Sequence, residues 1–189
     1  MPAARRRLEP GQRRDQLLDV AARLFADRPY EDVMMEQVGA AAGVSRALVY
    51  RYFPTKRDLF AAIYQRAADS LLAATEIDPA VPAADWVEAG LDAHIDYFVA
   101  NAHTVLAANR DLAGDPVIQN IISAELTELR GRMLAAMDVA GQRRAVVSLA
   151  LPAWLSFVRT LCVEWLQHKE ISREELRALC LRTLYAAIG

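Results

Sequence analysis

A short segment near the amino terminus concentrates side chains that can hydrogen-bond to an anion or to the edge of a base. The set comprises six polar residues and one alanine: Ser45, Arg46, Ala47, Tyr50, Arg51, Tyr52 and Lys56. An arginine can donate two parallel hydrogen bonds to O6 and N7 of guanine, and hydroxyl and ammonium groups donate to phosphate oxygens. This chemistry is recognition of nucleic acid and requires no bond breaking.

Local signals place this set on a short helix that follows a tight turn. Gly43 suits a turn position with positive φ, which glycine adopts at little cost, and the Ser45 hydroxyl can cap the next helix. The residue before a proline avoids the α region, so Pro54 should end that helix near Phe53. Two helices joined by a turn of a few residues, the second carrying Ser, Arg and Tyr, match a helix-turn-helix that enters a major groove.

The capping signals at the starts of the other helices differ in clarity. Thr55 with Asp58 three residues later, and Ser172 with Glu175, each have the pattern of a capping box. The helix before the turn has Asp32 as its nearest capping candidate, which leaves its exact start open.

The run from Arg14 to Leu59 resembles the DNA-binding domain of the tetracycline-repressor (TetR) family of bacterial transcriptional regulators. The resemblance is carried by Ala21, Leu24 and Phe25 in the first helix, by the turn Ala42-Gly43-Val44-Ser45, and by Tyr50, Tyr52, Phe53, Lys56 and Leu59. Two departures concern the second helix: Met34 and Met35 stand where the family often has Ser or Thr, and Gly39 stands where it often has Ala. A helical glycine costs about 0.5–1 kcal/mol relative to alanine, although it can allow closer helix packing.

This resemblance implies an all-α fold of about nine helices. A helix-turn-helix head, residues 1–54, would be joined by a long fourth helix to a ligand-binding and dimerisation body, residues 55–189. It also implies a homodimer formed through the last two helices. Such a dimer would bind a palindromic operator in double-stranded DNA and leave it when a small-molecule effector binds, most simply as a repressor. A DNA-binding regulator or activator without a small-molecule ligand is the alternative.

Four residues of the set have two possible roles. Arg46 contacts a base or only phosphate, and Ala47 touches a thymine methyl or is merely small enough to admit the helix. Tyr50 and Tyr52 lie at family positions that usually contact phosphate, although one ring could belong to the core. Lys56, in the first turn of a helix, lies beside exposed amides that suit an anion. An arginine cluster at residues 5–7 could enter a minor groove, but a disordered terminus is the commoner outcome.

Charge is divided unevenly along the chain. The net charge is −2, yet residues 1–66 contain 12 Lys/Arg against 8 Asp/Glu, and the remainder contains 10 against 16. A head of +4 on a body of −6 indicates which end meets phosphate. Apolar residues make up 54% of the chain and charged residues 24%, which is a globular composition.

Helical periodicity without strand-like alternation extends over the rest of the chain. The predicted helices cover Gln12–Asp27, Thr55–Thr75, Asp85–Asn101, Pro116–Met137, Gln142–His168 and Ser172–Ile188. A less regular piece is expected up to Gly114, and Gly141 is expected to act as a stop. The helix from Gln142 is apolar nearly all round, so more than one side of it should be covered. A second copy of the chain could supply that cover.

Two of these helices carry aromatic and apolar residues with a few polar groups, as a ligand pocket requires. The candidates are His94, Tyr97, Phe98, Asn101, Trp154, Phe157, Val158, Cys162 and Trp165. The same residues also describe an ordinary core. Asp92 and Asp96 are one turn apart and predict a solvated face. If they turned inward, they would favour a cationic ligand.

Several function classes find no support in the sequence. It has no nucleophile–base pair, phosphate loop or metal-ligand spacing, so no enzyme, metal or cofactor is expected. Cys162 and Cys180 lie in apolar helical patterns and predict reduced, buried thiols. The longest uncharged run, Ala145–Val158, has 14 residues, whereas a membrane span needs roughly 17–25. A soluble cytoplasmic protein is the expectation.

Overall fold

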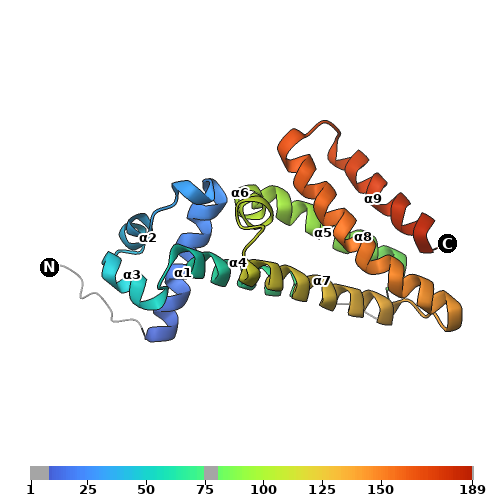
Figure 1. Cartoon of the computed structure of the whole chain (residues 1–189), viewed down its shortest axis with the longest axis horizontal. Helices are drawn as coiled ribbons and strands as arrows, with labels where there is room; N and C mark the ends of the chain where they lie inside the picture. The colour runs from blue at the N-terminus through green and yellow to red at the C-terminus, as the bar shows by residue number, and fades with distance from the viewer. Residues whose placement is uncertain (1–8, 75–80, 189) are drawn as a thin grey trace.

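The chain folds into helices joined by short connections (Figure 1). The structure is a computed structural model and describes residues 9–74 and 81–188. Within those ranges it contains nine α-helices, one 3₁₀ turn (η1), one π-helical segment (η2) and no strand. In chain order they are α1 (Pro10–Asp27), η1 (Tyr30–Asp32), α2 (Met35–Ala41), α3 (Arg46–Tyr52), α4 (Lys56–Ala74), α5 (Ala83–Ala100), α6 (Ala102–Leu106), η2 (Ala107–Asp111), α7 (Pro116–Ala136), α8 (Gly141–His168) and α9 (Arg173–Ile188).

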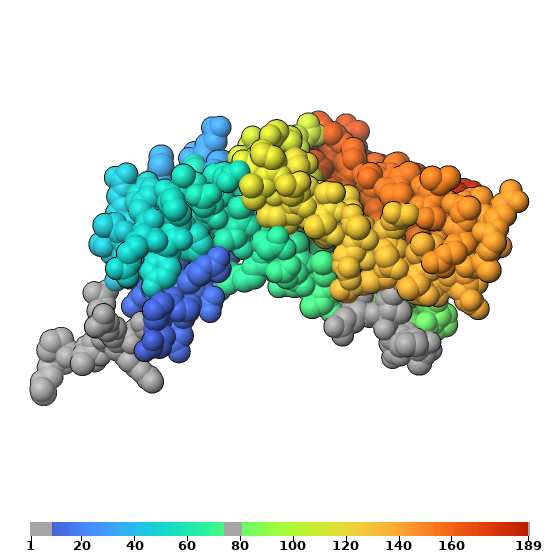
Figure 2. Space-filling model, turned by 60° about the horizontal axis from the view of Figure 1, so that its bottom comes forward, coloured from blue at the N-terminus to red at the C-terminus, as the bar shows by residue number. Residues whose placement is uncertain are grey.

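The molecule is elongated, with α1–α3 at one end and α8 and α9 at the other (Figure 1). Helix α4 begins among α1–α3 and continues alongside α7, so it belongs to both parts. The space-filling view shows the same order along the surface, with the α4 region between the amino-terminal end and the α7–α8 layer (Figure 2).

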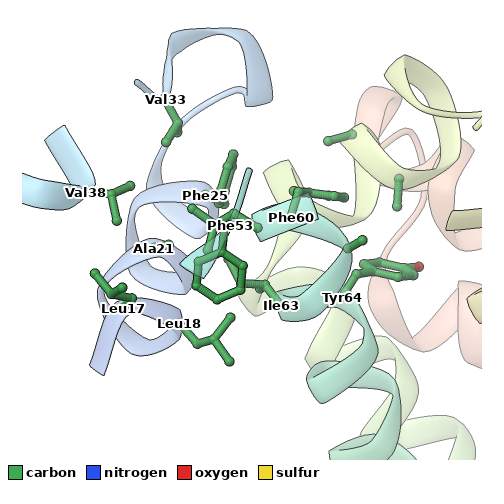
Figure 3. Packing of buried hydrophobic residues seen from close by; sticks show 14 of the residues in the cluster. Leu17, Leu18, Ala21, Phe25, Val33, Val38, Phe53, Phe60, Ile63 and Tyr64 are labelled. Atoms are coloured by element: carbon green, nitrogen blue, oxygen red, sulfur yellow. The ribbon is translucent and has the colours of Figure 1, made fainter. Parts of the chain in front are cut away.

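The amino-terminal part has a core built on aromatic rings (Figure 3). Phe60 of α4 meets Phe25 of α1 edge-on, with ring centroids 5.2 Å apart, and meets Tyr30 of η1 at the same distance. Phe25 and Phe60 are fully buried. Edge-to-face aromatic pairs contribute about 0.5–1.5 kcal/mol beyond the area they bury. These rings therefore fix α1 and η1 against the first turns of α4.

This core does not end at the third helix. It continues into η2 and the start of α7 through Ala108, Ile118 and Ile121, which are buried in the same cluster. At its edge Arg57 of α4 forms a two-pronged ion pair with Asp115, with N–O distances of 2.7 and 3.2 Å. Asp115 also caps α7, and its hydrogen bonds with Arg57 lower its pKa. The head is thus packed onto one end of the body.

The local signals around the turn are confirmed. Gly43 has a φ of 66°, the left-handed conformation expected of it. The Ser45 hydroxyl accepts a hydrogen bond from the Leu48 amide at 3.2 Å. Thr55 caps α4 through the Asp58 amide at 3.0 Å.

The carboxy-terminal capping box is confirmed as well. The two residues cap each other. The Glu175 N–H donates a hydrogen bond to Ser172 Oγ, and the Ser172 N–H donates one to Glu175 Oε2. The all-α prediction also holds across the described part of the chain.

Three local predictions are wrong. Asp32 ends the 3₁₀ turn and does not cap α2; the Met34 amide before α2 instead donates to the Gln37 side chain at 2.9 Å. Gly141 begins α8, with a φ of 55°, and does not stop a helix before it. Residues 102–111, expected to be less regular, are helical with a π segment. The predicted end of α4 at Thr75 lies outside the described residues.

Helix α8 is long and apolar enough to cross a membrane by length and composition, and 44% of its most apolar stretch is buried inside the structure. The inner face packs on α7 and α9. The opposite face is exposed and carries Val146, Leu149 and Phe157, with Leu149 at 78% exposure. Surface of this kind, continuous along one helix, marks an interaction site.

Gly39 lies where α2 crosses the start of α3. A Cβ atom built there would come within 3.1 Å of the Val44 carbonyl oxygen and 3.4 Å of the Arg46 amide nitrogen. Both neighbours are backbone atoms held by the turn, which gives way less readily than a side chain. The glycine thus permits the close approach of the two helices, and its departure from the family pattern has a packing reason.

We predict that Gly39→Ala destabilises the chain although alanine favours a helix, because the added methyl group displaces the turn. Gly131→Ala is the matched control: a Cβ atom there meets nothing within 4 Å, so it should add about 0.5–1 kcal/mol. Urea unfolding measures both. A stabilising effect of equal size at both positions would show that the close approach at Gly39 is unimportant.

Candidate nucleic-acid interface and body cavity

Helix α3 stands on two buried side chains and turns its other faces outward. Val49 is fully buried, and Phe53, directly after the helix, is 3% exposed. Ser45, Arg46, Ala47 and Arg51 are all exposed. The helix lies at the end of the molecule farthest from α8 and α9 (Figure 1). The exposed side chains therefore form a surface that no other described part of the chain covers.

Arg46 is held by neighbours on two helices. Its guanidinium lies 2.5 Å from Glu36 of α2 and 3.5 Å from the Tyr50 hydroxyl, and it stacks over the Tyr50 ring at 5.2 Å. The hydroxyl and then the carboxylate raise the pKa of Arg46. Since the Arg46 and Glu36 side chains are 60% and 50% exposed, the pair is readily exchanged for another partner.

Lys56 is engaged in a different way. Its ammonium donates to the carbonyl oxygens of Tyr30 at 2.9 Å and Glu31 at 3.3 Å, and lies 4.3 Å from the centre of the Tyr30 ring. These contacts fasten η1 to the start of α4. An ammonium has three N–H donors, so one is left for a further acceptor.

The two tyrosines of α3 are half-buried. Tyr50 and Tyr52 both pack against the core of the head. The Arg51 guanidinium lies 5.8 Å from the centre of the Tyr52 ring. Each ring thus contributes to packing while part of it reaches the surface. The arginine cluster at residues 5–7 lies outside the described residues.

The body contains a cavity bounded by α4, α5, α7 and α8. Its empty volume is about 560 Å³, counted to its open mouth. It is lined by Leu71, Trp86, Val87, Gly90, Leu91, His94, Leu126, Leu129, Met133, Trp154, Leu155 and Val158. An apolar hollow between helices with few polar groups is the usual form of a small-molecule site.

The structure brings only some of the predicted pocket residues together. His94, Trp154 and Val158 line this cavity, whereas Tyr97 and Phe98 line a smaller neighbour of about 220 Å³ that shares Leu71. The other four lie elsewhere. Asn101 and Trp165 hydrogen-bond to the carbonyls of Tyr97 and Ile171, Phe157 is 37% exposed on α8, and Cys162 is a buried thiol. Burial raises the pKa of Cys162 to about 12.

His94 is kept uncharged by its surroundings. It packs against Phe98, with ring centroids 4.1 Å apart and the ring planes tilted by 36°. Burial, together with the positive charge of Arg159, lowers the pKa of His94 to about 3. At neutral pH the ring therefore contributes no charge to the cavity.

Comparisons with known proteins agree with this arrangement. Residues 17–63 match the family described as bacterial regulatory proteins, tetR family. FasR, an HTH-type transcriptional activator of Mycolicibacterium smegmatis, is 39% identical over 66 residues, which are 35% of this chain and only 30% of that protein. SCO4008, an HTH-type transcriptional repressor of Streptomyces coelicolor, is 24% identical over 145 residues, 77% of this chain and 72% of that protein. The crystal structure of a tetR-family transcriptional regulator from Streptomyces coelicolor has a TM-score of 0.85 at 26% identity, covering 95% of this chain and 82% of that one.

The chain belongs to the TetR family. In this TetR-family protein the match covers the head by sequence and nearly the whole chain by fold. The resemblance seen in the turn and in α3 therefore extends to the arrangement of the body.

The buried ion pair of Arg159 in this TetR-family chain was not predicted from the sequence. Arg159 of α8, 6% exposed, donates to Glu125 of α7 at 2.6 Å and to the Tyr64 hydroxyl of α4 at 2.9 Å. Two signals were present in the sequence. Arg159 is the one charged residue between Ala145 and Val163, and Glu125 falls on the apolar face of its helix. A lone charge on a buried face requires a partner.

Because His94 is neutral in the folded chain and titrates normally when unfolded, acid should destabilise the protein through it. Stability is present above the unfolded pKa of 6.5 and is lost as pH falls toward the folded value of about 3. Between pH 7 and pH 5 we expect a loss of about 2 kcal/mol from this residue. Urea unfolding of His94→Leu should lack that loss, while His168→Gln, at an exposed histidine, should retain it. An equal acid response of His94→Leu and the parent chain would contradict the burial of His94.

Proposed function

We propose that this chain is a ligand-responsive DNA-binding transcriptional regulator, acting as a repressor that a small-molecule effector releases from a palindromic operator. The observation that carries the proposal is the exposed face of α3, with Ser45, Arg46 and Arg51 at the end of the molecule. A short capped helix that presents an arginine from a rigid core suits entry into a major groove.

The proposed DNA contacts are Ser45, Arg46, Ala47, Tyr50, Arg51, Tyr52 and Lys56. Arg46 reads a base after leaving Glu36, and the hydroxyls and the other cations bind phosphate. Lys56 takes part through its remaining donor while it keeps η1 in place. The division into a head, residues 1–54, and a body, residues 55–189, remains part of the proposal. The chain has two hydrophobic clusters, one in α1–α4 with η2 and the start of α7, and one in α5–α9; they support two parts, with α4 shared between them.

Repression is proposed over activation because of how much of each relative matches this chain. SCO4008, matched over most of its length, is described as a repressor, while FasR, matched over the head, is an activator. The cavity supports the effector, because its lining includes Leu71 of α4, the helix that also packs against the head. A regulator or activator without a ligand is the alternative, and the cavity favours the ligand-responsive form. The matched relatives are named as regulators, so we propose no enzymatic role and a cytoplasmic location.

The proposed assembly is a homodimer through α8 and α9. The outer face of α8 exposes Val146, Leu149 and Phe157, and Tyr185 of α9 is 42% exposed. A two-fold axis would place this patch against its own copy. Two heads could then read half-sites whose centres lie roughly 34–36 Å apart, or a multiple of that distance.

Selection of binding sites from a random DNA pool tests the proposal. The recovered sites should be near-palindromic, with half-sites one helical turn apart or a multiple. A set of sites with no common sequence, or one asymmetric half-site bound by a single chain, would contradict it.

Substitutions at Arg46 and Glu36 should change operator affinity in opposite directions. Arg46→Ala should lower affinity by about 1–3 kcal/mol, since a base or phosphate contact is lost. Glu36→Gln should raise affinity by about 1 kcal/mol, because it removes a negative charge beside the DNA and frees the guanidinium. Fluorescence anisotropy with the selected site measures both. Glu128→Gln, an acidic residue on the body, is the matched control and should change nothing. If Arg46→Ala bound like the parent chain, α3 would not be the reading helix.

Leu149→Glu should separate the dimer into monomers, because it places a charge in the centre of the apolar face. Sedimentation at micromolar concentration measures the change, and operator affinity should fall with it. Val117→Glu is the control, since Val117 is also an exposed apolar residue, at 38%, but lies on α7. Dimers of Leu149→Glu as stable as those of the parent would remove α8 from the interface.

A further inference from the structure

The body cavity includes two buried polar atoms that no described residue engages. Trp86 Nε1 and His94 Nε2, both on α5, are buried without a hydrogen-bond partner among residues 9–74 and 81–188. The other indoles are satisfied: Trp154 donates to the Cys180 carbonyl and Trp165 to the Ile171 carbonyl, each at 2.8 Å. Buried polar groups are nearly always paired, so each exception requires an explanation.

The position of Trp86 strengthens the case. It is 9% exposed and lines the cavity beside Val87 and Gly90. An indole N–H can only donate. It therefore requires a hydrogen-bond acceptor, and the cavity that Trp86 lines is the free space beside this residue.

The cavity is also uncharged. Its lining contains no Asp, Glu, Lys or Arg, and His94 is neutral because burial lowers its pKa to about 3. The charges near it are already paired. Arg159 is neutralised by Glu125, and Arg173 and Arg177 of α9 bind the Asp96 and Asp92 carboxylates at 2.7 and 3.0 Å.

These pairs bear on the ligand's charge. Asp92 and Asp96 meet α9 and are absent from the cavity lining, which removes the sequence-based reason to expect a cationic ligand. Arg159 pairs with Glu125 and lines the neighbouring cavity, and not this one; its Nε–H has no hydrogen-bond partner among the described residues. Burying an unpaired charge in such a place is costly.

We propose that the cavity binds an uncharged, mainly apolar effector with at least one hydrogen-bond acceptor, such as an alcohol, ketone or ester, whose oxygen accepts the Trp86 N–H. This rests on the proposed ligand-responsive function and specifies the class of ligand. His94, two turns farther along α5, offers a second neutral contact. Specificity arises from the absence of charge in the lining together with the single donor at Trp86.

Three probes with the same ten-carbon chain test the class: 1-decanol, decanoate and decylammonium. Each is titrated into the DNA-free protein at pH 7.5, below its aggregation limit, and followed by tryptophan fluorescence and calorimetry. Trp86 and Trp154 line the cavity, so binding changes the emission. We expect 1-decanol to bind at least about tenfold more tightly than either ion, since the ions must bury a charge. Tighter binding of decanoate or decylammonium, or no binding of 1-decanol, would overturn the proposal.

A pair of tryptophan variants locates the contact. Trp86→Phe should weaken 1-decanol about fivefold by loss of one hydrogen bond and leave toluene binding unchanged. It should lower the melting temperature less than Trp154→Phe does, because both variants lose buried ring area but only the second loses a protein hydrogen bond. Trp154→Phe should lower the melting temperature by about 2–4 °C through loss of its bond to Cys180. Equal 1-decanol affinity of Trp86→Phe and the parent would overturn the role of Trp86.

These measurements use no DNA, so they remain readable if no operator is found. A preference for a charged probe would likewise overturn the ligand class while leaving operator binding intact. The two failures are therefore distinguishable.

Discussion

The buried contact of Arg159 with Glu125 and Tyr64 ties together the three helices on which the arrangement of head and body depends. It joins α8, α7 and α4 at a point where Arg159 and Glu125 are 6% and 4% exposed. Separating such a pair leaves a charge uncompensated and costs about 3–5 kcal/mol. Tyr64 follows the aromatic core of the head by one turn, its ring stacked 6.0 Å from that of Phe60. The position of α4 in the body thus sets the position of the head.

This geometry gives a physical route from cavity to reading helix. Leu71 of α4 lines both the main cavity and its neighbour, and the neighbour is also lined by Tyr64 and Arg159. A molecule that presses on Leu71 acts on a helix whose start is clamped to α7 by Arg57 and Asp115. Leu71 thus connects the cavity to the helix whose first turns pack against α1 and η1. Packed cores change between discrete arrangements and do not yield gradually.

The sequence predicted those features of the fold whose signals act over a few residues, and it did not predict contacts between residues far apart in the chain. Gly43, Ser45 and Thr55 act on residues within three or four positions, and the turn and both helix starts came out as expected. The pairing of Arg159 with Glu125 spans 34 positions, and no local pattern states which helices will meet. Gly141 shows the same limit in small form: a glycine at positive φ suits a helix end or a start, and the neighbouring helices decide which.

Charge and apolar surface divide the molecule between its two ends. Exposed donors lie on α3 in the basic head, and three of the nine exposed large hydrophobic residues among the described ones lie on α8 in the acidic body. An acidic body repels phosphate and confines a DNA duplex to the head. Within the head, Glu36 holds Arg46 while no nucleic acid is bound. In the proposed complex, Arg46 would exchange this carboxylate for the acceptors of a base or phosphate, which would favour sites that offer two acceptors to the guanidinium over sites that offer one.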